Sequence, residues 1–281
     1  MKQAQKNTPF PLPSRVKGAR VETPSIQSLD RGLLILDTVG KARAPVSLGQ
    51  LTEVLGIDRS SVFRLANTLK RRGYLANPSS GKEYILGTAV WQLSRQYDWS
   101  SMLVNVAHEQ LESLARSTNE TAHIAIREGA NARFVDHVAT GHIIAISGQS
   151  GESVPLYCTS HGKALLVDFD ERQLKALLGS TPLQRHTKQT IVSISELARA
   201  CQRDQKRGYA VDDSEFIDGV RCMAAPIRDR NGAVIASIGV SAPVSRFPSE
   251  RDKEYARTVT EIAAQIGALL CGGAQVAERS A

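Results

Sequence analysis

Apolar residues recur at helical spacing in three successive segments of the first third of the chain. The first stripe begins at Ile26 and ends near Gly40. The second begins after Ser47, whose hydroxyl can form a capping box with Gln50 three residues later. The third begins soon after Gly56, a residue suited to a sharp exit from a helix. The spacing predicts three short helices, the last two joined by a tight turn, which is the helix-turn-helix pattern.

Two short strands are predicted directly after the third helix, at Tyr74–Ala76 and Glu83–Leu86. A hairpin at this position makes the motif a winged helix-turn-helix. Apolar residues then return to helical spacing over residues 87–118, which predicts linker helices between the head and the rest of the chain.

The remaining chain alternates between helices and antiparallel hairpins. Two strand pairs are predicted, each around a short turn: 123–127 with 133–138, and 223–227 with 234–240. Four helices are predicted, at 160–168, 171–178, 194–207 and 250–271. Hairpins combined with helices in this way predict an α+β fold rather than a doubly wound parallel sheet.

These elements divide the chain into four parts: an arm over 1–25, the winged head over 26–86, the linker helices over 87–118 and a C-terminal domain over 119–275. The arm has four prolines and five basic residues but a single acid, which predicts disorder. A solvated tail is its favoured interpretation, and a basic arm that touches phosphates is the alternative.

The positive charge of the chain is concentrated in the first third. The whole chain has a formal net charge of +7. Residues 1–99 contain 15 basic and 7 acidic residues, whereas residues 100–281 contain 20 and 21. A basic head on a nearly neutral body predicts a module that binds a polyanion and a body with another task.

Several classes of protein are excluded or disfavoured. The longest largely apolar run is too short to span a bilayer, and the N-terminus lacks the apolar segment of a secretion signal. Four widely spaced cysteines form no C-x-x-C pair, so we expect reduced thiols, a cytoplasmic protein and neither a structural metal nor a cofactor. A metal site at Asp136, His137 and His142 is considered and set aside, because no known ligand motif accompanies them.

The predicted third helix has a basic outer surface that suits DNA. Five basic residues and no acid lie between Arg59 and Arg72. In a major groove, arginine can pair with guanine, asparagine with adenine, and phenylalanine can pack on a thymine methyl. A solvated basic helix on a structural domain is the less favoured alternative. The residues expected to contact double-stranded DNA are Ser47, Arg59, Ser60, Ser61, Phe63, Arg64, Asn67, Thr68, Lys70, Arg71 and Lys82.

Over residues 26–271 the chain resembles the IclR family of bacterial transcription regulators. The segments Ser28–Leu33 and Arg72–Leu75 are similar to the family's winged head, and Val154–Leu166 is similar to its "PLH-TA-GKALLA" run. Residues 207–213, 219–226 and 240–246 resemble further family segments. Tyr157, the pair Ser160–His161 and the stretch 239–242 depart from the usual residues. The resemblance implies a GAF-like α/β effector-binding domain with an antiparallel sheet, self-assembly into dimers or dimers of dimers, and effector-controlled regulation, more often repression.

A pocket for a small acid is expected around the start of the helix after Thr159. Free N–H groups at a helix start suit a carboxylate, although Thr159 or Ser160 acting only as a cap is the simpler alternative. Asp212 can accept from a ligand hydroxyl, and Ser241 can donate. Core packing explains the apolar members equally well. The expected effector-binding residues are Ile146, Val154, Thr159, Ser160, His161, Asp212, Val220, Cys222, Gly239 and Ser241. They suit a hydroxy-, oxo-, sugar or aromatic acid.

Two other functions are weighed against an effector-controlled regulator. A DNA-binding architectural protein without a ligand would not need so large a neutral body. Ser160 and Lys163 match the S-x-x-K signature of serine acyl-enzymes, but the companion motifs are absent from the sequence. We therefore predict no catalytic residues and no enzyme activity.

Overall fold

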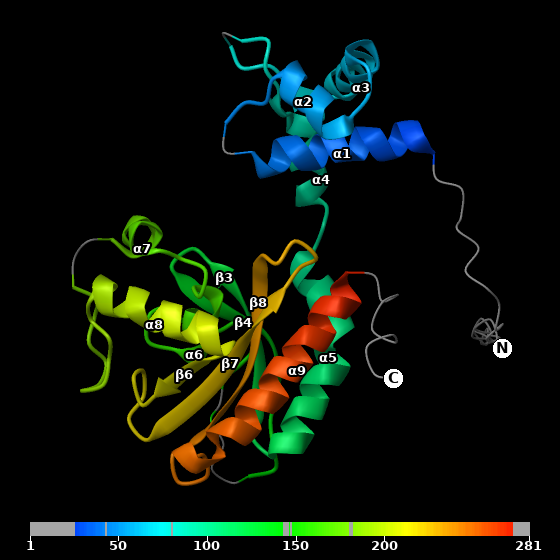
Figure 1. The fold of residues 1–281 in the computed structure, drawn as a ribbon. Coiled ribbons are helices and arrows are strands. Elements are labelled where there is room, and N and C mark those ends of the chain that lie inside the picture. Colours follow the sequence, from blue (N-terminus) through cyan, green and yellow to red (C-terminus); the bar gives the residue numbers. More distant parts are fainter. Residues whose placement is uncertain are drawn as a thin grey trace, which may run out of the picture. The chain divides into compact units, whose positions relative to one another are not determined.

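The computed structural model describes residues 26–42, 44–79, 81–142, 146, 148–179 and 182–271. The predicted arm over 1–25 and the last residues of the predicted C-terminal domain, 272–275, lie outside the described residues. The chain divides into two compact units, Met1–Tyr97 and Asp98–Ala281 (Figure 1). Both contain helices, and the second holds an antiparallel sheet, so the fold is α+β as predicted.

The N-terminal unit is a winged helix-turn-helix. Its elements are α1 (Gln27–Lys41), α2 (Leu48–Leu55), α3 (Arg59–Arg71), β1 (Leu75–Ala76), β2 (Ile85–Leu86) and α4 (Thr88–Arg95). β1 and β2 pair antiparallel to form the wing. Its core lies among the three helices and the wing, at Ile35, Val39, Val46, Leu51, Val62, Ala66, Leu75 and Tyr84.

Local hydrogen bonds set the ends of these helices where the sequence places them. The Ser47 hydroxyl accepts from the Gln50 N–H at 3.3 Å, and the Gln50 side chain accepts from the Ser47 N–H at 2.8 Å, which completes the predicted capping box. Gly56 ends α2 with φ of 62°, a conformation that favours glycine. Asp58 then caps α3 by accepting from the Ser61 N–H at 2.9 Å.

The C-terminal unit is built on one six-stranded antiparallel sheet of order β5-β4-β3-β8-β7-β6. Its strands are β3 (Thr121–Glu128), β4 (Asn131–Val138), β5 (Ser153–Pro155), β6 (Ala210–Asp213), β7 (Val220–Arg228) and β8 (Val234–Pro243). Its helices are α5 (Trp99–Thr118), α6 (Ser160–Leu165), α7 (Glu171–Leu178), α8 (Ile194–Arg207) and α9 (Asp252–Leu270), with a 3₁₀ turn η1 (Ser249–Arg251) before α9.

Helices cover both faces of this sheet. α5 and α9 lie side by side on one face, and the other face carries α6, α7 and α8 (Figure 1). Leu111, Ile124 and Ile262 belong to the core under α5 and α9, whereas Leu156, Leu166 and Leu197 belong to the core on the opposite face. The candidate site described below lies on this second face.

The structure refines two of the expected boundaries. The division between the two units falls at residues 97 and 98, inside the predicted linker segment 87–118. α5 contributes four fully buried residues to the core of the C-terminal unit, so it is part of that unit's packing. The helix predicted at 160–168 ends at Leu165, since Leu166 leaves the helical conformation. The short edge strand β5 was not predicted, because three residues show no periodicity.

Candidate functional site

A cavity of about 70 Å³ lies against the face of the sheet that carries α6. All six strands contribute to its lining: His123, Phe134 and Val154 come from β3, β4 and β5, while Asp212, Cys222 and Ser241 come from β6, β7 and β8. Ser160 and His161 enter from the first turn of α6. Apolar side chains at residues 146, 216, 217 and 220 complete the wall. Such a mixture of apolar walls and few polar groups is typical of small-molecule sites.

Register brings Asp212, Cys222 and Ser241 together although they are far apart in the sequence. Asp212 lies opposite Cys222 in the β6–β7 ladder, and Cys222 lies opposite Ser241 in the β7–β8 ladder. These three residues therefore form one row across three adjacent strands. In an antiparallel sheet, directly opposed residues have side chains on the same face.

The polar side chains around the cavity are unusually short of protein partners. Ser160 Oγ, His161 Nε2 and both ring nitrogens of His123 are buried without a hydrogen bond of ordinary geometry. Each of the three residues is at most 2% exposed. Buried polar groups are nearly always paired, so several unpaired ones around one cavity indicate a functional site.

Burial keeps both histidines neutral. It lowers the pKa of His161 to about 3 and that of His123 to about 4. The electrostatic effect of His123 also lowers the pKa of His161, and that of His137 also lowers the pKa of His123. At neutral pH the cavity therefore presents imidazole rings that both donate and accept hydrogen bonds.

Asp212 is the acid of the cavity and is nearly fully buried. One of its oxygens accepts from the Glu215 N–H at 2.7 Å. Burial raises the pKa of Asp212 to about 7, while the Lys163 ammonium acts in the opposite direction. Near neutral pH this carboxyl therefore exists in both forms, and in the protonated form it can donate to a ligand.

The predicted effector-binding residues are brought together with one exception. Ile146, Val154, Thr159, Ser160, His161, Asp212, Val220, Cys222 and Ser241 all line the cavity. Gly239 does not. It lies in β8 beside Ala224, and a β-carbon there would meet the Met223 carbonyl at 2.4 Å, so its role is close packing within the sheet.

Sequence reasoning missed several lining residues. His123, Phe134, Gly148, Glu152, Phe216 and Ile217 also line the cavity. His123 and Phe134 fall in predicted strands, and a polar histidine inside an otherwise apolar strand was the signal that could have drawn attention to His123. The loop residues Phe216 and Ile217 carried no such signal.

The first turn of α6 is held tightly against the preceding chain. Thr159 caps the helix by accepting from the Gly162 N–H at 3.1 Å, and its hydroxyl donates to the Pro155 carbonyl at 2.7 Å. A β-carbon at Gly162 would lie 2.3 Å from backbone atoms of Leu156. Capping and a role at the cavity are therefore compatible, because Ser160 and His161 still face it.

A second surface, on the N-terminal unit, suits nucleic acid. The outer side of α3 and the wing enclose a groove of about 610 Å³. Six of the predicted DNA contacts line it: Ser47, Arg59, Phe63, Asn67, Lys70 and Lys82. Phe63 is 47% exposed, so an apolar ring faces solvent among polar neighbours. An exposed phenylalanine here fits contact with a thymine methyl.

Three other predicted contacts lie along a different side of α3. Ser61, Arg64 and Thr68 line a smaller hollow with Ser28 and Arg31 of α1. Sequence reasoning did not single out these two α1 residues. The Ser60 hydroxyl donates to Asp58 at 2.6 Å, and the Thr68 hydroxyl donates to the Arg64 carbonyl at 2.9 Å. Donation from either hydroxyl to a phosphate therefore requires an exchange of partner.

In a comparison with known proteins, each of the two units matches a protein-family model. Residues 28–78 match the family model described as "IclR helix-turn-helix domain", and residues 97–268 match "Bacterial transcriptional regulator IclR C-terminal". The chain belongs to the IclR family. It is therefore a DNA-binding transcription regulator, as the resemblance implied.

Individual relatives of this IclR-family protein agree along nearly its whole length. It is 29% identical to the transcriptional repressor IclR of Escherichia coli over 87% of this chain and 90% of that protein. It is 29% identical to the transcriptional regulator KdgR of Escherichia coli over 87% and 92% of the two chains. The crystal structure of Thermotoga maritima IclR superposes with a TM-score of 0.57 at 28% identity, over 88% of this chain and 99% of that one.

The geometry of this regulator does not favour an acyl-enzyme. Lys163 Nζ is buried and forms an ion pair with Glu215, whereas Ser160 Oγ has no hydrogen-bond partner. A nucleophile needs its base within hydrogen-bond reach. Cys158 is fully buried, and burial raises its pKa to about 12, so it is a poor nucleophile.

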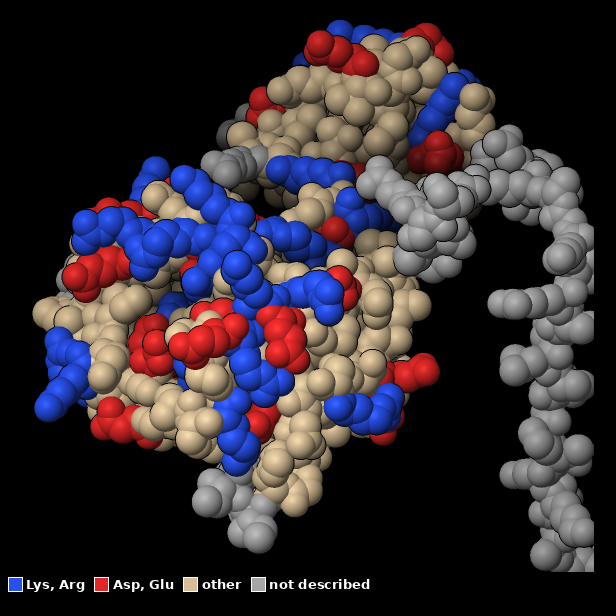
Figure 2. All heavy atoms as spheres, turned by 60° about the horizontal axis from the view of Figure 1, so that its bottom comes forward, with Lys and Arg blue, Asp and Glu red and all other residues tan. Residues whose placement is uncertain are grey.

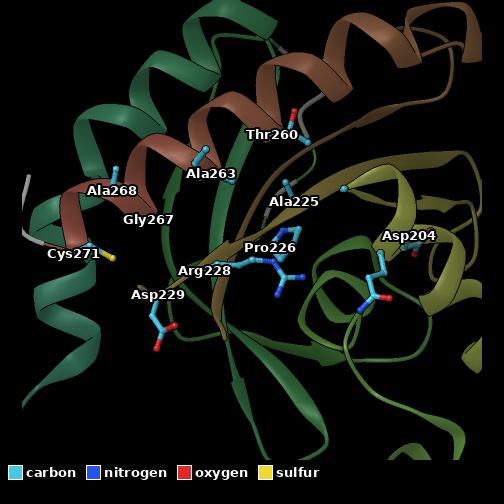
Figure 3. Close-up of a pocket in the computed structure, with 13 residues that line it drawn as sticks. Asp204, Ala225, Pro226, Arg228, Asp229, Thr260, Ala263, Gly267, Ala268 and Cys271 are labelled. Carbon is cyan, nitrogen blue, oxygen red and sulfur yellow. The ribbon is translucent and has the colours of Figure 1, made fainter. Parts of the chain in front are cut away.

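A larger hollow of about 440 Å³ lies elsewhere on the C-terminal unit, between α9 and β7 (Figure 3). Small residues of α9, Ala263 and Gly267 among them, face Ala225 and Pro226 of β7. The Arg228 guanidinium at its rim is paired with Asp168 at 2.6 Å. Its polar groups are mostly paired within the protein, with Asp204 Oδ2 buried and unpaired, whereas Ser160 Oγ, His161 Nε2 and both His123 nitrogens are unpaired at the smaller cavity.

The surface charge of the C-terminal unit is mixed. Figure 2 shows basic and acidic side chains next to one another on the face it presents, in keeping with the near balance of charge in residues 100–281. Among the described residues no helix is long and apolar enough to cross a membrane. In the same part of the chain no group of three or more candidate ligands could hold a metal ion.

Proposed function

We propose that this protein is an operator-specific repressor whose DNA binding is controlled by a small organic acid in the cavity of the C-terminal unit. The observation that carries the proposal is the set of buried, unpartnered polar side chains at that cavity. A transcription regulator that keeps such groups beside a cavity has a site for a ligand to satisfy. Relatives named as repressors support repression rather than activation.

An acid can be held here without a basic side chain. Among the lining residues that the structure describes there is no lysine or arginine. The donors are the hydroxyl of Ser241, the N–H groups at the start of α6 that the cap leaves free, and Asp212 in its protonated form. Binding of a carboxylate is therefore expected to favour proton uptake by the site.

Operator recognition is assigned to α3 and the wing. Arg59, Phe63 and Asn67 fall on one side of α3, four residues apart, and face the groove shared with Lys82. This spacing suits base contacts in a major groove, and the basic residues at the end of α3 add contacts with phosphates.

A second copy of the chain is the expected protein partner. Large apolar side chains of α1 and α4 are exposed, among them Leu29 at 59%, Trp91 at 59% and Leu93 at 54%. Exposed apolar patches of this kind mark interaction sites. A dimer also provides the two heads that a two-fold operator requires.

The ligand then acts by binding two arrangements of the protein with different affinity. A change in the spacing of two heads that are matched to half-sites about 34 Å apart would remove several DNA contacts. The protein is expected to act on cytoplasmic DNA.

A screen of small carboxylates by thermal shift, followed by a gel-shift titration with each hit, tests the proposal. A ligand at about 100 times its Kd should stabilise the fold by about 2.7 kcal/mol and should change operator affinity. Asp212→Ala should keep operator affinity and lose the response. A ligand that fills the cavity but leaves operator affinity unchanged would favour the ligand-independent architectural protein.

A further inference from the structure

Three polar residues of the cavity have buried hydrogen-bonding atoms without a protein partner: both ring nitrogens of His123, Nε2 of His161 and Oγ of Ser160. The rings of His123 and His161 lie edge to face, with centroids 6.0 Å apart. Phe134 packs against both rings, with centroids at 4.7 Å from His123 and 5.3 Å from His161. Ser160 precedes His161 and also lines the cavity. The two histidine rings therefore mark one position in the cavity, beside the aromatic wall of Phe134.

The protonation of His123 decides which ligand atoms fit this position. A neutral imidazole has one N–H donor and one bare nitrogen acceptor. Neither ring nitrogen of His123 has a hydrogen-bond partner in the protein. The bare nitrogen is an acceptor that only a donor can satisfy. A carboxylate or a ketone oxygen has no proton to offer.

The hydrogen bonding of His161 also favours a hydroxyl group at this position. Its Nδ1 lies 3.0 Å from the Ser237 hydroxyl, which is also within 3.5 Å of the Ala125 carbonyl. If Ser237 donates to the carbonyl, His161 Nε2 is an acceptor; if Ser237 donates to the ring, Nε2 is a donor. A hydroxyl group matches either tautomer, since it donates and accepts.

Charge also disfavours a carboxylate at this position. Among the described residues that line the cavity there is no lysine or arginine, so no counter-ion stands beside the two imidazoles. The nearby Lys163 is committed to its ion pair with Glu215. A carboxylate placed between the two imidazoles would be desolvated without a counter-ion.

We propose that His123, Ser160 and His161 form a subsite that selects a hydroxyl group, so that the effector is a hydroxy-acid rather than a simple or an oxo acid. The inference rests on the proposed role of the cavity as the effector site. The acid end of the ligand lies outside this subsite, toward the Ser241 hydroxyl and the protonated form of Asp212, which can both donate to it.

Matched pairs of acids with and without the hydroxyl test the subsite. The probes are glycolate with acetate, lactate with propionate, and 4-hydroxybenzoate with benzoate, measured on the full chain by thermal shift and titration calorimetry. The hydroxylated member of at least one pair should bind about tenfold or more tightly than its partner, because an unpaired buried polar group penalises the analogue that lacks the hydroxyl.

Variants then assign the preference to these side chains. His161→Phe and His123→Phe should each reduce it to about threefold or less, with the affinity for the deoxy member unchanged. His142→Phe is the control, since this histidine is half-buried, bonds the Asn119 carbonyl and does not line the cavity; it should keep the full preference. If His161→Phe does not fold, Ser160→Ala removes a polar group with a smaller change of volume.

Each outcome decides a different point. Equal binding of both members of every pair to the wild type overturns the hydroxyl subsite and leaves the effector cavity standing. A preference that survives in both histidine variants also overturns it. Binding of no member of any pair overturns the subsite, and a negative result in the wider carboxylate screen would then overturn the effector site itself.

Discussion

At the scale of single residues, the C-terminal unit keeps polar groups where apolar ones would fold more easily. His123 makes no side-chain hydrogen bond of ordinary geometry, and Asp212 is an acid in a nearly closed site. Such residues lower stability, because a buried polar group loses its water without full replacement. We expect a bound ligand to supply their missing partners, so the ligand-free protein should gain stability when such a group is replaced by an apolar one.

His123→Phe is expected to raise the stability of the ligand-free protein, by about 1 kcal/mol. The phenyl ring has a similar shape and removes two buried nitrogens without breaking a bond. Urea unfolding of wild type and variant measures the difference, with His142→Phe, which loses a hydrogen bond to the Asn119 carbonyl, as a control expected to lose stability. A loss of more than about 1 kcal/mol would show that the His123 nitrogens have a structural partner.

Asp212 should make stability fall as the pH rises from about 4 to about 7. Its pKa is raised to about 7 in the folded chain, mainly by burial, against roughly 3.9 in an unfolded one. The folded state therefore holds a proton that the unfolded state has lost in this window, and above it the difference is constant.

Asp212→Asn removes this pH dependence while keeping an oxygen that can accept from the Glu215 N–H. The advantage of the variant over the wild type in free energy of unfolding should grow by about 2 kcal/mol between pH 5 and pH 8. Asp218→Asn, at an exposed position, should show no such trend. Parallel pH profiles for wild type and Asp212→Asn would contradict the raised pKa.

At the scale of elements, α3 divides its polar residues between two sides. Arg59, Phe63 and Asn67 face the groove beside the wing, whereas Ser61, Arg64 and Thr68 face a hollow shared with α1. A helix in a major groove presents bases with one side and lies close to the two phosphate backbones with its flanks. The division therefore separates candidate base contacts from candidate backbone contacts.

Arg59→Ala and Arg64→Ala distinguish these roles. If Arg59 contacts a base, its loss should cost about 1–3 kcal/mol of operator affinity and relax sequence preference. Loss of Arg64, on the other side of α3, should weaken operator and random DNA alike and reduce the slope of log K against log salt by about 1. Gel shifts on both DNAs at several salt concentrations measure this. An equal loss on random DNA for Arg59→Ala would reassign it to a phosphate.

At the scale of the whole molecule, the chain consists of two compact units with separate cores. The core of the N-terminal unit contains Ile35 and Leu51, and that of the C-terminal unit contains Leu111 and Ile238. Each unit therefore has its own source of stability. The excess of positive charge lies with the first unit, so we expect DNA to bind there and the proposed effector to bind in the second.

A chain limited to residues 98–281 should fold, keep ligand stabilisation and lose DNA binding. The full chain should bind DNA with an affinity that falls steeply with salt, since phosphate contacts release counter-ions. Thermal shift and gel shift of both chains compare them directly. Operator binding by residues 98–281 alone would contradict the assignment of DNA binding to the N-terminal unit.

Local patterns in the sequence were sufficient to predict most helices of this chain. Apolar spacing, the Ser47–Gln50 capping box and Gly56 predicted the three helices of the head, and α7 and α8 begin and end where the sequence placed them. These signals involve residues within a few positions of one another, so they can be recognised from the sequence without the tertiary structure. The family resemblance extended this reading to the C-terminal domain and to nine residues that line the cavity.

The composition of the cavity was decided only by the tertiary structure. Asp212, Cys222 and Ser241 become neighbours through the register of three strands, and His123 meets His161 across the sheet and α6. Phe216 and Ile217 join them from a loop, while Gly239 is excluded by tight packing against Ala224. Periodicity determines which face of a strand a residue occupies, but strand register and loop path depend on contacts between distant residues.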